Sequence, residues 1–467
     1  MSKQRLSTHL TTLAAFVLTL VGAVVSRADS YAQDASVKQG YAIVASSNVL
    51  NDSDWSQVVD SLKAKREGEY SVATFEWSDK LLDELKEARP KYICFVFQPT
   101  EATKERVVEI WRLTRQLDDD PYGDAIWGIV TGAKASDALR LTKTEDCAVE
   151  TAVGATSIPL EYFKSGIVFD EGRKNHRKVK EEGKDVEDLM DAPDDTTHAI
   201  SDALNGAQLF VTSGHASEQN WSIGYSYKNG FFVAKDEKLL GVPSNDKPYE
   251  ITAEGSKIQL ASGNCLWGNI TGTDCMALAM IGNANVDMFM GYIVTTWFGY
   301  MGWGTLDYYL EQPGRFTVAE AVFANNQALL NLLENKEGLS PQYVLGLQHD
   351  RDVVALYGDP AWRNPLSEQK SGWSQTLTSE QTTDGRTQWT LTITPLKGKE
   401  SFSLIDGNGS ERGGRPIFQF FPYDVEDPQI VDACGLPVVA TENFILAPIK
   451  NQEISTDAPT VIKVTTK

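Results

Sequence analysis

The first part of the chain alternates short apolar runs with amphipathic stretches, and this alternation restricts the fold more than any other feature. Apolar runs at 41–45, 70–75, 92–97 and 125–130 have the length of buried strands. Between the first two runs, Trp55, Val58, Val59 and Leu62 recur at helical spacing, and a second helical stretch ends at Pro90. Strands separated by helices predict an α/β fold with a mostly parallel sheet between helical layers.

The alternation pauses between residues 170 and 195 and then resumes. Asp170–Asp195 is crowded with charged side chains and lacks periodicity, which predicts a solvated loop or an exposed helix; a processing or regulatory loop is the alternative. Apolar segments at 208–212, 257–262, 291–296 and 352–357 predict further strands, and residues 318–334 predict a helix before the last of them. We therefore expect two α/β subdomains, over residues 33–150 and 151–368.

After Pro365 the pattern changes to a period of two. Trp389, Leu391 and Ile393 alternate with threonines, and Asp384-Gly385 just before them is a hairpin signal. Helical periodicity does not return. Residues 369–467 are therefore expected to form a separate small β-sandwich.

The N-terminus has the features of a cleaved secretion signal. Lys3 and Arg5 precede an apolar stretch over 10–25, and small residues stand at −3 and −1 for cleavage after Ala28 or Ala32. The alternative is a membrane anchor, but the stretch is shorter than the roughly 20 residues that a span needs. We expect residues 1–32 to be a signal peptide and the mature chain to be exported, periplasmic or extracellular, with no stable membrane span.

Composition excludes several classes of function. The 467 residues carry 43 basic and 64 acidic side chains, a net charge of −21, which would repel the phosphates of nucleic acid. Five cysteines are too few for a disulfide framework, and no C-x-x-C or H-x-x-H spacing indicates zinc. We expect no metal site and no required cofactor, although the many acids leave a structural calcium ion open as an alternative.

Two predicted strands end in residues that suit nucleophilic catalysis. The strand over 208–212 leads through small residues to His215, and the strand over 257–262 leads through small residues to Cys265, fifty residues later. Reactive groups gather at the carboxyl ends of parallel strands, and an imidazole there can take the proton of a thiol. Each residue alone has a structural interpretation, a surface histidine or a core thiol. As a pair on consecutive strands they predict a His/Cys dyad.

Other cysteines and histidines fit this chemistry less well. Cys275 lies in a predicted helix packed on the sheet, and Cys94 lies inside a predicted strand. His349, in Gln348-His349-Asp350, is the one serious rival base, and its structural interpretation is a polar turn before the last strand of the sheet.

Together with this order of strand, His, strand and Cys, two further motifs resemble the gingipain family of caspase-like cysteine peptidases. One is the apolar strand with Gly358-Asp359-Pro360 after it, which in that family ends the catalytic region before an immunoglobulin-like domain. The other is Gly128–Gly132 followed by Ser136-Asp137-Ala138, which resembles the close of the family's first subdomain. Caspases also keep their His about fifty residues before the Cys.

The resemblance implies a caspase/gingipain-like fold followed by an Ig-like domain, and a peptidase that forms a thioester acyl-enzyme. It implies that His215 is the general base, that Cys265 is the nucleophile, and that the backbone amides of Ala216 and Cys265 bind the oxyanion. Two departures stand out: Ala216 replaces the glycine usual after the His, and Asn264 replaces the small residue usual before the Cys.

These departures keep a second function open, a catalytically inactive homologue that acts as a secreted or surface binding or assembly protein. A solute-binding protein with two lobes is a third alternative, but it leaves the His and Cys unexplained. For the peptidase, the expected partner is a protein or peptide substrate.

The predicted substrate contacts are Gly214, Asn264, Trp297 and Trp303. The last two lie in an aromatic, Gly-rich stretch after the strand that follows the nucleophile. The structural alternative for that stretch is a buried strand with a packed loop. A basic substrate side chain would need a carboxylate, and Asp170, Glu218, Asp274 and Asp307 are equal candidates for it.

Overall fold

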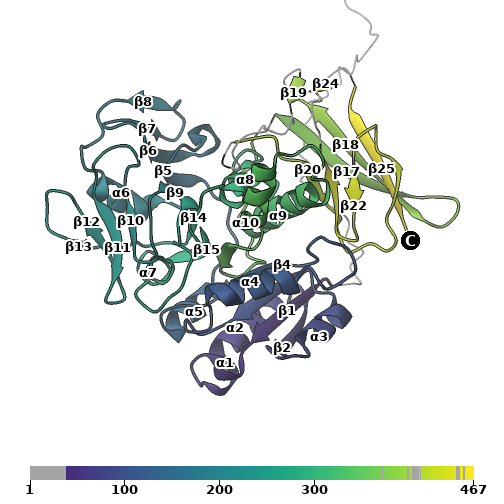
Figure 1. Ribbon diagram of the computed structural model, residues 1–467, viewed down its shortest axis with the longest axis horizontal. Helices are drawn as coiled ribbons and strands as arrows, with labels where there is room; N and C mark the ends of the chain where they lie inside the picture. The colour runs from purple at the N-terminus through teal and green to yellow at the C-terminus, as the bar shows by residue number, and fades with distance from the viewer. Residues whose placement is uncertain are drawn as a thin grey trace, which may run out of the picture. The chain divides into compact units, whose positions relative to one another are not determined.

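A computed structural model describes residues 38–369, 372–396, 410, 412–448 and 458–467, and the backbone of two short strands at 399–401 and 453–455. The predicted signal peptide lies outside these residues. Residues 38–467 belong to one compact unit. Its centre is a 12-stranded, mostly parallel sheet flanked by helices, and small antiparallel sheets follow toward the C-terminus (Figure 1).

The first block of the large sheet is parallel, in the order β2-β1-β3-β4. Its strands are β1 (Gly40–Ala45), β2 (Ser71–Glu76), β3 (Tyr92–Val96) and β4 (Ile126–Val130). The helices of this part are α1 (Ser47–Asn51), α2 (Ser56–Arg66), α3 (Leu81–Ala88), α4 (Lys104–Leu113) and α5 (Ala135–Leu141). The alternation predicted from the sequence is therefore confirmed here, because each apolar run becomes a strand and each amphipathic stretch a helix.

The second block is also parallel over five strands, in the order β15-β14-β9-β5-β6. These strands are β5 (Thr151–Ala155), β6 (Ser165–Phe169), β9 (Leu209–Gly214), β14 (Lys257–Asn264) and β15 (Val286–Tyr292). The helices of this part are η1 (Leu160–Tyr162), α6 (Thr197–Ala203), η2 (Leu204–Gly206), α7 (Met276–Asn283), α8 (Tyr300–Tyr309), α9 (Val318–Glu334) and α10 (Pro341–Asp350).

Strand β16 (Val354–Tyr357) joins the two blocks. It is antiparallel to β15 and parallel to β4, so the strands of the first block run opposite to β5, β9 and β14. Asp359, just after β16, is buried and accepts hydrogen bonds from the buried Arg66 of α2, at 2.9 and 2.6 Å, and from the Tyr41 hydroxyl of β1, at 2.9 Å. The Gly358-Asp359-Pro360 motif therefore ties the last strand of the sheet to the first block.

Several segments differ from the sequence prediction. Strands β5 and β6 had not been predicted, and the stretch interpreted as a packed loop and the polar turn at His349 are helices α8 and α10. The charged stretch predicted as a loop or helix contains two antiparallel edge strands, β7 (Arg177–Lys180) and β8 (Glu187–Leu189), which extend the sheet beyond β6. The strand predicted at 291–296 is β15, which begins at Val286, and its last four predicted residues follow the strand. The chain segment that connects β9 to β14 forms a separate antiparallel sheet, which had not been predicted. Its strands are β10 (Asn220–Ser222), β11 (Phe231–Lys235), β12 (Lys238–Val242) and β13 (Tyr249–Glu250).

The C-terminal region is antiparallel, as predicted, and has its own apolar core around Trp389, Leu391 and Ile393. Its sheets are β17 (Trp373–Gln381), β18 (Thr387–Pro395), β25 (Thr460–Thr466) and β21 (Gln429–Asp432); β20 (Ile417–Phe420), β23 (Phe444–Ala447) and β22 (Val439–Ala440); and β19 (Lys399–Ser401) with β24 (Glu453–Ser455). Within the described part of the chain, α10 is the last helix.

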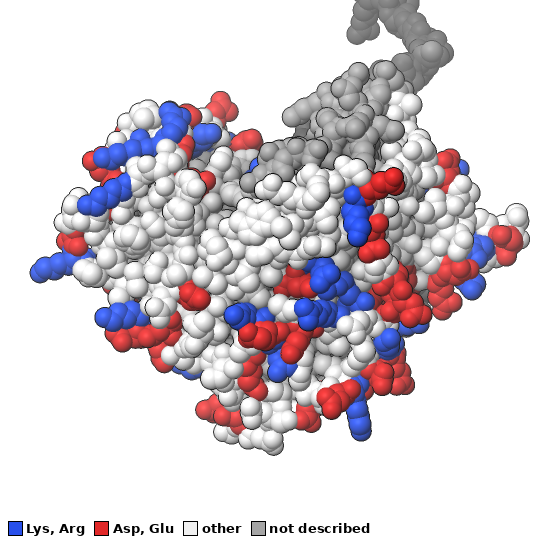
Figure 2. All heavy atoms as spheres, viewed as in Figure 1, with Lys and Arg blue, Asp and Glu red and all other residues white. Residues whose placement is uncertain are grey.

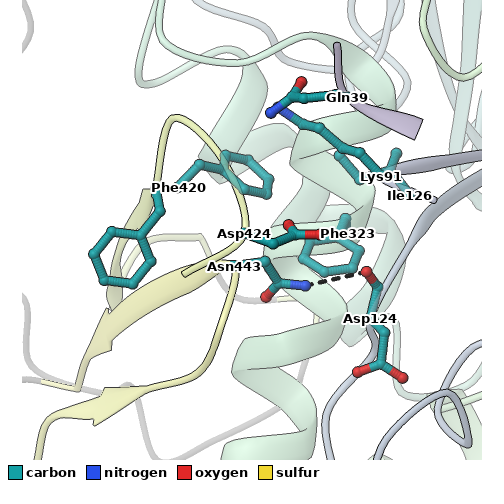
Figure 3. Close-up of a pocket in the computed structure, with 9 residues that line it drawn as sticks. Gln39, Lys91, Asp124, Ile126, Phe323, Phe420, Asp424 and Asn443 are labelled. Atoms are coloured by element: carbon teal, nitrogen blue, oxygen red, sulfur yellow. Dashed lines mark hydrogen bonds between the residues drawn. The ribbon is translucent and has the colours of Figure 1, made fainter. Parts of the chain in front are cut away.

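The C-terminal region contacts the α/β part at several places, two of which involve buried or acidic groups. Arg412 and Arg415 donate to the buried carboxylate of Asp307 in α8, at 2.6 and 3.0 Å. The Asn443 side chain donates to the Asp124 carbonyl at 3.1 Å, beside a small pocket in which Phe323 of α9 also lies (Figure 3).

Charged side chains are unevenly spread over the face seen in Figure 2. They gather over the helices of the first block and over the β7–β8 hairpin, whereas few lie over α8 and α10. Among the described residues, no helix is both long enough and apolar enough to cross a membrane.

Candidate active site at the ends of β9 and β14

The structure brings the two predicted catalytic residues to the same edge of the sheet. Strands β9 and β14 are parallel neighbours, and Gly214 lies opposite Asn264 in their register. His215 and Cys265 are each the next residue along the chain. Because neighbouring strands lie about 4.8 Å apart, the backbones of the two residues leave the sheet side by side.

Asn264 and Gly214 hold the two strand ends together. The buried Asn264 side chain accepts a hydrogen bond from the Thr212 hydroxyl at 2.7 Å and donates to the Gly214 carbonyl at 3.3 Å. Gly214 has a φ of +105°, a conformation that L side chains rarely adopt. These two predicted substrate contacts thus fix the positions from which His215 and Cys265 extend.

The Cys265 thiol is half-buried and faces the loop after β15. Its Sγ accepts a hydrogen bond from the Thr296 backbone amide at 3.3 Å and lies 3.7 Å from the Thr296 carbonyl oxygen. Leu266, the next residue, has a φ of +60°, so the chain turns sharply just after the thiol. Among the described residues, no hydrogen bond joins Sγ to the imidazole of His215.

The His215 side chain is exposed and stacks on Tyr225. The ring centroids are 4.9 Å apart and the planes meet at 27°. The His215 carbonyl accepts the amide of Ser222 at 2.9 Å, and Ala216 forms an isolated antiparallel bridge with Trp221. The backbone of this segment is therefore fixed by β10, while its imidazole faces solvent and the ring of Tyr225.

The two predicted tryptophan contacts lie close to the Cys265 side of the site. Trp303 is half-buried and packs on Gly263, where an added Cβ would lie 3.3 Å from the indole. Trp297 is 44 % exposed and lies against His349, with ring centroids 5.6 Å apart. His349, the alternative candidate for the general base, already has a hydrogen-bond partner, because its Nε2 lies 3.0 Å from the Thr295 carbonyl oxygen.

Three of the other four cysteines lie in surroundings that disfavour a thiolate. Burial raises the pKa of Cys275 to about 11 and places the pKa of Cys94 well above its ordinary value. The pKa of Cys147 is also raised, by burial and by Asp146. Cys434 is exposed in the C-terminal region. Cys265 is thus the accessible thiol at the carboxyl end of a central strand.

Each carboxylate considered for a basic substrate side chain already has a partner. Asp307 is buried under Arg412 and Arg415, and Asp170 accepts from the buried His176 at 2.8 Å. Glu218 accepts from Asn269 at 3.2 Å, and Asp274 accepts from the Glu237 amide at 2.8 Å. None of these contacts selects one of the four as a specificity residue.

One acidic cluster within the described residues brings ligand atoms close together. Carboxylate oxygens of Asp118, Asp120 and Asp124, in the α4–β4 connection, lie within 4.8 Å of one another. Burial and the neighbouring acids raise the pKa of Asp124 to about 9 and that of Glu442 to about 8. The three aspartates are the residues that could hold a calcium ion. They lie at the contact with the C-terminal region, where Asn443 donates to the Asp124 carbonyl.

Sequence reasoning missed two residues that contact the candidate dyad, Thr296 and Tyr225. Thr296 had a weak signal, because it precedes Trp297 in the aromatic stretch already singled out. Tyr225 had none, since it lies ten residues after His215 in a segment with no recognised pattern.

Comparison with known proteins adds no relative to this description. No family model matches the chain, and neither a curated protein nor a solved structure does. Function is therefore inferred from the residues and geometry of this chain.

Proposed function

We propose that the protein is a cysteine endopeptidase with His215 as general base and Cys265 as nucleophile. The observation that carries the proposal is the register of β9 and β14, because pairing of Gly214 with Asn264 makes the histidine and the cysteine neighbours at one sheet edge. An exposed imidazole and a half-buried thiol on adjacent strand ends are the groups that acyl transfer needs.

The proposed reaction has two halves. His215 takes the proton of the Cys265 thiol, and the thiolate attacks the peptide carbonyl carbon to give a tetrahedral oxyanion. As the C–N bond breaks, the imidazolium gives its proton to the leaving amine, and a thioester remains. His215 then takes a proton from water, the hydroxide attacks the thioester, and the C–S bond breaks. The imidazolium returns its proton to the departing thiolate, which regenerates the thiol and releases the acid product.

Backbone amides support both charged species in this scheme. The Thr296 amide already donates to Sγ. The amides of Ala216 and Cys265, at the two strand ends, are proposed to bind the oxyanion. Removing one such donor typically costs about 100- to 1,000-fold in kcat.

The imidazole has to reach Sγ for the first proton transfer. The thiol is hydrogen-bonded to Thr296, and the imidazole lies on Tyr225. Catalytic hydrogen bonds are often long before substrate binds and shorten in the substrate complex. Rotation of the His215 side chain toward the thiol is therefore part of the proposal.

We also propose a more specific fold assignment than the α/β architecture described above. We propose a caspase/gingipain-like catalytic region, with subdomains at 33–150 and 151–368, and an Ig-like domain at 369–467. The support is the order of strand, His, strand and Cys, together with the Gly358-Asp359-Pro360 motif after β16. Residues 1–32 are proposed to direct export to the periplasm or the cell exterior.

Selective labelling of the thiol tests the proposal. Iodoacetamide at limiting concentration should modify Cys265 ahead of Cys275 and Cys94 in the folded protein, with exposed Cys434 as the reference for simple accessibility. Cys265→Ala and His215→Ala should each abolish cleavage of a denatured casein substrate, whereas Cys434→Ala should retain it. Equal rates for Cys265 and Cys434, with cleavage that survives His215→Ala, would contradict the dyad.

A second function, an inactive homologue that binds or assembles at a surface, is favoured by one observation. Sγ has Thr296 rather than His215 as its hydrogen-bond partner. In that case Cys265 labelling would be independent of His215, and no peptide substrate would be cleaved.

A further inference from the structure

Tyr225 is an exposed aromatic residue that lies on the candidate general base. Its side chain is 60 % exposed, so burial in a core does not explain its position. Its ring stacks on the His215 imidazole at 4.9 Å, with 27° between the planes. Because core packing does not hold the Tyr225 ring, its position beside the imidazole must be set by the backbone of its own segment.

The backbone of Tyr225 is fixed to the end of β6. The Tyr225 amide donates to the Glu171 carbonyl at 2.6 Å, and the Tyr227 hydroxyl donates to the Asp170 carbonyl at 2.8 Å. Gly224 has a φ of +80°, and an added Cβ there would lie 3.2 Å from the Tyr227 ring. The turn that presents Tyr225 is therefore bonded to the residues that follow β6, which is separated from β9 by β5 in the same sheet.

His215 is fixed only through its backbone. Its carbonyl accepts the Ser222 amide, and within the described part of the chain no hydrogen bond holds the imidazole. An exposed histidine side chain with no such bond samples several rotamers. Contact with Tyr225 restricts this sampling, because the ring covers one face of the imidazole.

We propose that Tyr225 is a positioning residue for the His215 imidazole. This inference rests on the proposed peptidase function and names a residue that the dyad itself does not include. The stack limits how freely the imidazole rotates before it turns toward the Cys265 thiol. It also places a π face beside the imidazolium that forms when the thiol proton is transferred, and such contacts stabilise a cation at exposed sites.

Three substitutions separate the stack from simple bulk. Tyr225→Phe keeps the ring and should retain kcat. Tyr225→Leu keeps bulk without a π face, and Tyr225→Ala removes both; each should lower kcat by about two- to fivefold through the lost cation–π contact, with little change in KM. Tyr423→Ala is the matched control, because Tyr423 is also exposed and lies against an aromatic ring, that of Trp389.

A direct readout of the stack is the NMR resonance of the His215 ring protons, assigned with His215→Ala. Stacking should displace them upfield in the full-length protein and in Tyr225→Phe, and the displacement should be lost in Tyr225→Leu. A KM increase at constant kcat would overturn the proposal and make Tyr225 a substrate contact. Unchanged kinetics in Tyr225→Ala would also overturn it.

The experiment distinguishes this inference from the proposed function. If the protein cleaves no peptide and Cys265 is not selectively alkylated, the peptidase proposal fails, and positioning of a general base fails with it even where the upfield displacement is present. If cleavage requires both Cys265 and His215 but Tyr225→Leu behaves like the unmodified protein, the peptidase proposal stands and the role of Tyr225 alone is wrong.

Discussion

The acidic cluster at the contact with the C-terminal region should make the stability of this protein fall as pH rises. Asp124 is held by bonds on both sides of the contact: its carboxylate accepts the Leu117 amide at 3.0 Å, and its carbonyl accepts the Asn443 side chain. Its second carboxylate oxygen is buried and has no hydrogen-bond partner among the described residues. Burial and the nearby acids raise its pKa to about 9.

The sign and size of the effect follow from proton linkage. An unfolded aspartate has a pKa of about 3.9. Below that pH both states hold the proton, and the full stability is present. Between that pH and about 9 the folded protein holds a proton that the unfolded chain has lost, so stability falls by about 1.4 kcal/mol per pH unit. From pH 5 to pH 8 one such carboxyl costs about 4 kcal/mol.

Urea denaturation at pH 5, 6, 7 and 8 measures this slope. Asp124→Asn should flatten it and raise stability at pH 8, because an asparagine oxygen still accepts the Leu117 amide and carries no charge. Asp119→Asn, an exposed neighbour, should leave the slope unchanged. A stability that is constant or rises over this range would refute the reasoning. A gain with added calcium at pH 8 that Asp124→Asn removes would instead assign the cluster to a bound cation.

Two substitutions test how the sheet supports the site. Asp359→Asn should destabilise the protein by about 3–5 kcal/mol, because it leaves the buried Arg66 guanidinium without its carboxylate; urea unfolding measures this, with exposed Asp79→Asn as the control. Gly302→Ala should cost about 1–3 kcal/mol, because its Cβ would lie 1.9 Å from the carbonyl oxygen of Ser262 in β14 and force α8 away from that strand. Gly206→Ala, which meets open space, should be nearly neutral in the same urea unfolding assay.

Periodicity predicted the parts of the fold in which one face of each element is buried. The apolar run that became β3 is buried at every position, and Val58, Val59 and Leu62 form the buried side of α2. The helix expected at about 318–334 has these ends in the structure, where Thr317 caps it and Glu320 completes a capping box. In such segments, local sequence and tertiary burial favour the same structure.

Segments with mixed burial could not be predicted in this way. Strand β7 is half-buried at all four positions, so its sequence does not alternate between apolar and polar residues. It forms a strand because it pairs with β6. The contact of Tyr225 with His215 depends on the turn at Gly224 and on the hydrogen bond from the Tyr225 amide to Glu171, which follows β6. Such a contact is set by tertiary structure, and no local pattern encodes it.

The orientation of the two sheet blocks explains why the candidate site draws on the second block alone. Because β15 and β16 are antiparallel, the carboxyl ends of β1, β3 and β4 point to the edge opposite that of β9 and β14. Consistent with this, Arg140 of α5, which follows β4, pairs with Asp287 near the amino end of β15. The residues placed to assist His215 and Cys265 are those after β6 and β15, such as Glu171 and Thr296. Additional groups that act on substrate should therefore be sought there rather than in the first block.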